Sequence, residues 1–100
     1  MEVGLKEVEE VIEKYREECE KIARELELEF LELRYTYYGN YWRFYADFKL
    51  GETKITIPVL ELIKTIKVVH VFKVVENIEN IENELKDVLN TLSCKQKVTL

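Results

Sequence analysis

Two glycine-led turns divide residues 31–57 into three runs of alternating side chains. The stretch reads LELRYTYY-GN-YWRFYADFKL-GE-TKITI. Glycine at the first central position of a two-residue loop is typical of a type II′ hairpin, so Gly39-Asn40 and Gly51-Glu52 each predict a tight antiparallel turn. The stretch therefore predicts a three-stranded antiparallel meander.

The two turns also predict strand registers that agree with each other. The first turn places Tyr37 opposite Trp42 and, further along, Leu31 opposite Phe48. The second turn places Phe48 opposite Ile55. Both registers collect large apolar side chains on one face of the sheet: Leu31, Leu33, Tyr35, Tyr37, Trp42, Phe44, Ala46, Phe48, Leu50, Ile55 and Ile57. A shift by one residue would scatter this set over both faces, so the agreement supports the meander.

The opposite face of the meander is expected to be polar and exposed. It carries Glu32, Arg34, Thr36, Tyr38, Tyr41, Arg43, Tyr45, Asp47, Lys49 and Lys54. Three interpretations remain open for it. Cross-strand pairs of tyrosine and arginine stabilise a solvated sheet, or these residues form a protein interface, since both types are enriched at binding hot spots. In the third, bases stack on the tyrosines and cations hold phosphates. The candidate interaction residues are Arg34, Tyr38, Tyr41, Arg43, Tyr45, Lys49 and Lys54.

Amphipathic helices are expected on both sides of this region. Residues 5–29 repeat apolar side chains at spacings of three and four, which predicts a helix that either covers the apolar face of the sheet or forms a coiled-coil dimer. We favour the covering role because a wide apolar sheet face needs a partner. Residues 76–93 show similar spacing and predict a second helix, followed by a frayed tail at 94–100.

Between the meander and the second helix, the pattern changes twice. Pro58 is expected to end the third strand, because proline is poorly tolerated in a central strand. Residues 59–66 then fit a short helix or an irregular connection. Residues 67–75 are rich in valine and predict a fourth strand, which is apolar on both faces. Such a strand is a poor open edge, so Val69, Val71 and Lys73 are candidates for pairing with a second chain.

Together these elements predict one α+β domain over residues 1–93, in the order α-β-β-β-(short α)-β-α, with both long helices packed on one face of an antiparallel sheet. The chain carries a net charge of −5, and charge is segregated within it. Residues 1–30 have a net charge of −6, whereas residues 31–57 have +1. This acidity disfavours nucleic-acid binding except at a local basic patch. A self-associating interaction module, forming a homodimer, is therefore the leading hypothesis, and nucleic-acid binding is the alternative.

The inventory of reactive residues is sparse. His70 is the sole histidine and Ser93 the sole serine, and the three glycines form no phosphate loop, so we expect no enzyme and no cofactor or metal. Cys19 and Cys94 are either two small semi-buried side chains or a disulfide. Charged residues interrupt every apolar run, so no membrane span is expected, and the acidic start is unlike a secretory signal. We thus expect an intracellular, cytoplasmic protein, and its 18 Glu and 11 Lys are typical of thermostable hyperthermophile proteins.

Overall fold

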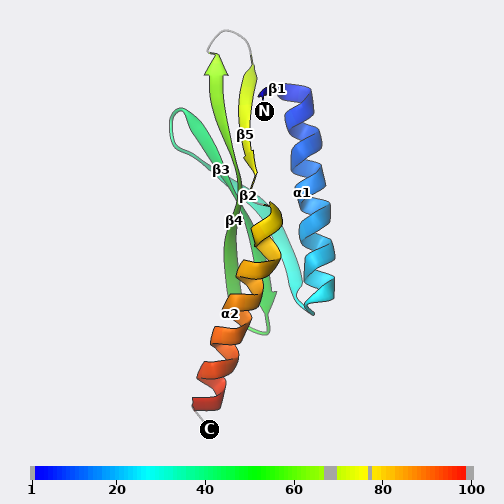
Figure 1. Cartoon of the computed structure of the whole chain (residues 1–100), viewed down its shortest axis with the longest axis vertical. Coiled ribbons are helices and arrows are strands. Elements are labelled where there is room, and N and C mark those ends of the chain that lie inside the picture. Colours follow the sequence, from blue (N-terminus) through cyan, green and yellow to red (C-terminus); the bar gives the residue numbers. More distant parts are fainter. Residues whose placement is uncertain (1, 67–69, 77, 99–100) are drawn as a thin grey trace.

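The computed structural model describes the backbone of residues 2–66, 70–76 and 78–98, and the side chains of 3–65, 70–75 and 81–92. Two long helices and five strands make up this part of the chain (Figure 1). The elements are β1 (Glu2–Gly4), α1 (Leu5–Glu25), β2 (Glu29–Tyr37), β3 (Tyr41–Leu50), β4 (Thr53–Ile66), β5 (Val71–Glu76) and α2 (Ile78–Val98). The strands form one antiparallel sheet in the order β1-β5-β4-β3-β2. The expected α+β class is confirmed.

Both hairpins of the meander form with the expected turns. Gly39 and Gly51 have φ angles of 96° and 61°, in the left-handed region that glycine tolerates. Tyr37 pairs with Trp42, and Phe48 pairs with Ile55, as predicted. The exception lies at the start of β2, where a bulge makes Phe30 rather than Leu31 the partner of Phe48. The extra residue turns Leu31 outward, so its predicted place on the buried face is wrong.

Strand β4 continues past Pro58, where we expected the third strand to end. It runs from Thr53 to Ile66, so the short helix or irregular connection expected at 59–66 is wrong. Pro58 is accommodated because it lies at a register shift, opposite Tyr45 of β3. The pairing of β4 with β5 begins only at Leu60. Pro58 therefore lies at a register shift with β3 and ahead of the pairing with β5, which is the kind of irregular position where a strand tolerates proline.

Strand β5 pairs with neighbours on both sides within the chain. It lies between β4 and the short strand β1, which the sequence pattern did not predict. Val71 pairs with Gly4 of β1 and Lys73 pairs with Glu2, so the backbone of these two candidate dimer residues is already used. The third candidate, Val69, lies outside the described residues. His70, expected inside the strand, is instead an exposed turn residue.

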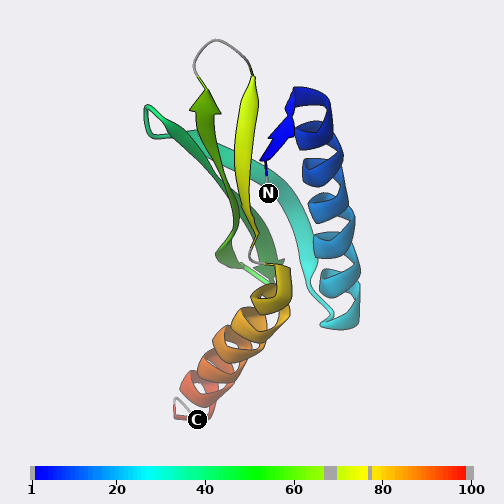
Figure 2. The same cartoon turned by 45° about the horizontal axis from the view of Figure 1, so that its top comes forward.

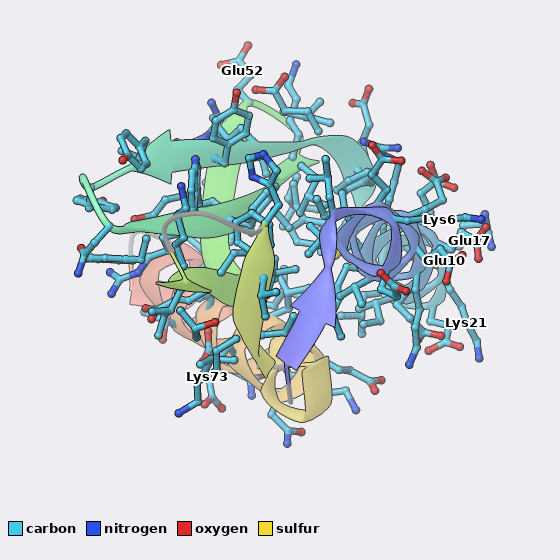
Figure 3. The ribbon with its side chains drawn as sticks, turned by 90° about the horizontal axis from the view of Figure 1, so that it is seen from above. Lys6, Glu10, Glu17, Lys21, Glu52 and Lys73 are labelled. Carbon is cyan, nitrogen blue, oxygen red and sulfur yellow. The ribbon has the colours of Figure 1, made fainter. Side chains whose placement is uncertain are left out.

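Helix α1 covers part of the sheet with its apolar stripe. Tyr15 and Cys19 are fully buried. On the opposite side of the helix, Lys6, Glu10, Glu17 and Lys21 point away from the sheet (Figure 3). The helix ends at Glu25, not at residue 29, because the chain must turn back into β2. Glu27 takes a left-handed φ of 58° there. The Leu28 N–H donates to the carbonyl oxygen of Ala23 at 2.8 Å, which closes the helix as a Schellman motif.

Helix α2 begins next to the sheet and projects beyond its end (Figure 2). Ile81 and Leu85 are fully buried in the core that α1 and the sheet share. The helix continues to Val98, so residues 94–98, which we expected to fray, are helical. Cys19 is a buried free thiol, so the disulfide with Cys94 is not formed. Burial raises the pKa of Cys19 to about 12, with smaller contributions from neighbouring glutamates.

Candidate interaction surfaces of the sheet

The polar face of the meander is organised around Asp47. The Arg34 Nε donates to one carboxylate oxygen at 2.8 Å, and the Thr56 hydroxyl donates to the other at 2.7 Å. The Lys54 ammonium lies 3.6 Å from the carboxylate. These side chains form a single layer that closes Asp47 off from solvent completely, although we had expected this residue to be exposed. It is the only charged residue among the described side chains that is buried.

The electrostatics of this carboxylate follow from its neighbours. Burial by itself would raise the pKa of Asp47, because it penalises the charged form. Hydrogen bonds from Thr56 and Arg34, together with the positive charges of Arg34 and Lys54, outweigh that effect and hold the pKa below the ordinary aspartate value. Asp47 is thus an ionised, enclosed carboxylate with its hydrogen bonds satisfied by the sheet itself.

Tyrosines and arginines of the same face contact each other near the first hairpin. The phenol oxygens of Tyr38 and Tyr45 lie 3.0 Å apart, and Tyr38 stacks on Tyr41 with ring centroids 4.9 Å apart. Arg34 lies over the Tyr45 ring, and Arg43 lies over the Tyr38 ring. Arg43 also forms a salt bridge with Glu61 of β4, at 2.7 Å.

The two phenols of this cluster have pKa values shifted in opposite directions. The hydrogen bond with Tyr38, followed by the contacts with Arg43 and Arg34, lowers the pKa of Tyr45. The same hydrogen bond raises the pKa of Tyr38. The structure therefore brings the predicted candidate residues together on one face, but it pairs both arginines with carboxylates of the sheet.

The apolar face differs between its two ends. Phe48 and Ala46 are fully buried under the helices, whereas Tyr35 and Tyr37 are 62% and 55% exposed. Their predicted place in the core is therefore wrong. They do lie on the expected face, where Tyr37 contacts the Trp42 ring at 4.8 Å. The difference arises because the helices cover the opposite end of this face.

An open apolar groove marks the uncovered end. Its volume is about 250 Å³, and it is lined by Leu5, Val8, Tyr35, Trp42, Phe44, Leu62 and Phe72. Leu5, at the first turn of α1, is 52% exposed. The spacing of apolar residues over 5–29 predicted Leu5 as part of the apolar helix face. Only the position of the helix end over the sheet reveals that Leu5 borders a groove. We define Leu5, Tyr35 and Tyr37 as the uncovered patch.

The edge of the sheet next to this patch is also open. Among the described residues, β2 has hydrogen-bonded strand pairing with β3 alone. The other edge strand, β1, is only three residues long, whereas β2 has nine. A row of backbone N–H and C=O groups along β2 is thus left without a strand partner in this part of the chain. The sequence pattern did not identify β2 as an edge, because strand order is not encoded in alternation.

The described side chains include no group of three or more His, Cys, Asp or Glu placed to hold a metal ion. None of the helices in the described chain is long and apolar enough to cross a membrane.

Comparison with known proteins finds no relative of this chain. No family model matches it, and no curated protein or solved structure matches it.

Proposed function

We propose that this protein is a small non-enzymatic interaction module that associates with itself, as a homodimer, through its sheet. The observation that carries the proposal is the uncovered patch. Two tyrosines that belong to the core face by register remain more than half exposed, next to an apolar groove. Exposed apolar surface grouped around a groove is typical of protein interfaces, and tyrosine is enriched at their centres.

The polar face supports this proposal less than the uncovered patch does. Its charged groups satisfy one another: Asp47 is enclosed by Arg34, Thr56 and Lys54, and Arg43 is paired with Glu61. Docking a partner there would require breaking or burying pairs that are already formed, which carries a desolvation cost. Of the three interpretations left open for this face, cross-strand stabilisation of a solvated sheet agrees best with these contacts.

The paired charges of the polar face also disfavour nucleic-acid binding, the alternative function. Phosphate recognition needs cations that are free to release their counterions. Arg34 and Arg43 each have a carboxylate within 3 Å, and Tyr38 and Tyr41 stack on each other, which occupies one face of each ring. The overall charge of −5 would further repel a polyanion.

Solution mass tests the proposal directly. Light scattering of the purified chain should give twice the monomer mass, at both low and moderate salt, because apolar contacts depend little on ionic strength. Tyr35→Lys should shift the protein towards monomer, since it places a charge in the patch. Asn40→Lys is the matched control: it adds the same charge at an exposed position of the β2–β3 turn, outside both the patch and β2, and its variant should remain dimeric.

Two results would contradict the proposal. One is a monomeric mass for the unsubstituted chain up to high micromolar concentration. The other is tight binding of a fluorescent oligonucleotide that falls steeply between low and moderate salt, which would favour the alternative.

A further inference from the structure

The open edge of β2 points to how the second copy binds. We propose that β2 pairs antiparallel with β2 of a second copy across a two-fold axis, with Tyr35 facing Tyr35, so that two five-stranded sheets join into one. This inference rests on the proposed self-association and specifies its partner surface. Addition of a strand to an exposed sheet edge is a common mode of recognition, in which main-chain hydrogen bonds supply affinity.

The length of the free edge favours a strand partner. The bulge near Leu31 interrupts β2, but its register with β3 is regular from Glu32 to Tyr37. Bulges, short edges and edge prolines or lysines are the usual devices that prevent strands from adding to one another. The regular part of β2 has no proline or lysine. Its two charged residues, Glu32 and Arg34, lie on the polar face, and Arg34 is already paired with Asp47.

The sequence of this segment limits how two copies can align. Opposing residues must come from the same face of the sheet, so that the apolar faces of both copies are continuous. This requirement leaves two long alignments. One places Arg34 opposite Arg34, which is destabilising because like charges then face each other directly. The other places Tyr35 opposite Tyr35, Leu33 opposite Tyr37, and Arg34 opposite Thr36, with no like charges facing each other.

The favoured alignment also accounts for the uncovered patch. Directly opposed side chains in an antiparallel pair have Cβ atoms about 5 Å apart, so the two Tyr35 rings and the Leu33–Tyr37 pairs come into contact. Tyr35 and Tyr37 would thereby lose the exposure that sets them apart from the rest of the core face. A two-fold axis perpendicular to the sheet keeps α1 and α2 of both copies on the same side of the joined sheet. It also makes the interface isologous, so that association ends at a dimer. A second copy therefore fits this edge, because the strand is complementary to itself in this alignment.

Symmetric disulfide formation tests the alignment. In a full-length chain carrying Cys94→Ser, Tyr35→Cys should cross-link rapidly under mild oxidation, because opposed Cα atoms lie about 5 Å apart, within disulfide range. Thr36→Cys is the matched control. In the same alignment the two Thr36 positions are offset by two residues along the strands, roughly 8 Å apart, which a disulfide cannot bridge. The Tyr35→Cys dimer should form at least about tenfold faster than the Thr36→Cys dimer.

A second measurement keeps the test independent of the cysteine substitutions. Hydrogen exchange of the unsubstituted chain should show protection of the 33–37 amides that increases with protein concentration. If the chain is dimeric but these amides exchange equally at all concentrations, the strand pairing is overturned while self-association stands. Faster cross-linking of Thr36→Cys than of Tyr35→Cys would overturn the alignment. A monomeric chain would remove both proposals.

Discussion

Two neighbouring residues of β3 show how differently the two faces of this sheet are built. Phe48 and Asp47 are adjacent in sequence, point to opposite faces and are both completely buried. Phe48 is covered by the shared core, to which both helices contribute. Asp47 is covered by a single layer of side chains from β2 and β4. One face thus depends on distant segments that pack together, whereas the other depends on its immediate cross-strand neighbours.

The largest expected effect lies on the helix-bearing face. Phe48→Ala should lower the free energy of unfolding by about 3–5 kcal/mol, because it removes a ring from a closely packed core and leaves a cavity. Tyr37→Ala, a truncation of an exposed ring on the same face, should cost less than about 1 kcal/mol in the monomer. Urea unfolding at low protein concentration measures both. Equal losses for the two variants would show that this face is not divided into a covered and an uncovered end.

On the polar face, Asp47→Asn tests whether a thin layer of charges contributes to stability. The variant keeps the shape but loses charge-assisted hydrogen bonds from Arg34 and Thr56, so unfolding should become easier by about 1–3 kcal/mol. Asp87→Asn on the exposed side of α2 is the matched control and should change stability by less than about 0.5 kcal/mol. If Asp47→Asn behaves like this control, the polar face contributes little beyond solubility.

The same variant predicts a pH dependence whose sign follows from the lowered pKa of Asp47. A carboxyl whose folded pKa is below its unfolded value, about 3.9, contributes stability above that value. The contribution is lost as the pH falls through the folded pKa. The stability difference between the unsubstituted chain and Asp47→Asn should therefore be largest near neutral pH and shrink on acidification. A difference that grows in acid would contradict the assigned direction.

A smaller effect concerns the turn that joins α1 to the sheet. Glu27→Gly should raise stability by about 1 kcal/mol, because glycine removes the steric cost of a left-handed φ. Glu20→Gly, at an exposed position in the interior of the helix, provides the opposite control and should destabilise by about 1 kcal/mol. Thermal unfolding followed by circular dichroism distinguishes the two directions.

The smallest effect on stability is expected from the tyrosine pair, whose readout is ionisation. Because the pKa of Tyr45 is lowered and that of Tyr38 is raised, the two phenols should ionise in separate steps as the pH increases. Tyr38→Phe removes the hydrogen bond and should move the ionisation of Tyr45 to higher pH. Absorbance near 295 nm follows the titration, and an unchanged curve for Tyr38→Phe would contradict the coupling.

Much of the local structure was predictable from the sequence. The alternation around Gly39 and Gly51 predicted which residues pair, because a tight turn sets the register of the strands that it joins. That register places Arg34, Tyr38 and Tyr45 on one face. The partners of Asp47 come from the same two hairpins, yet its complete burial was missed, because alternation assigns a face and not the cover that neighbouring side chains provide.

Features that depend on the relative placement of distant segments were not predictable in this way. Pro58 remains in β4 at a register shift with β3, ahead of the pairing with β5, and β1 was missed because three residues carry no usable pattern. The place of β2 at the edge and the exposure of Tyr35 likewise follow from strand order and from how far the helices reach. The sequence by itself determined the two turns and, away from the bulge at Leu31, the registers and side-chain faces of the meander, since these are set by near neighbours. The tertiary structure alone decided which part of the apolar face is covered and which edge is open, because both depend on contacts between elements far apart in the chain.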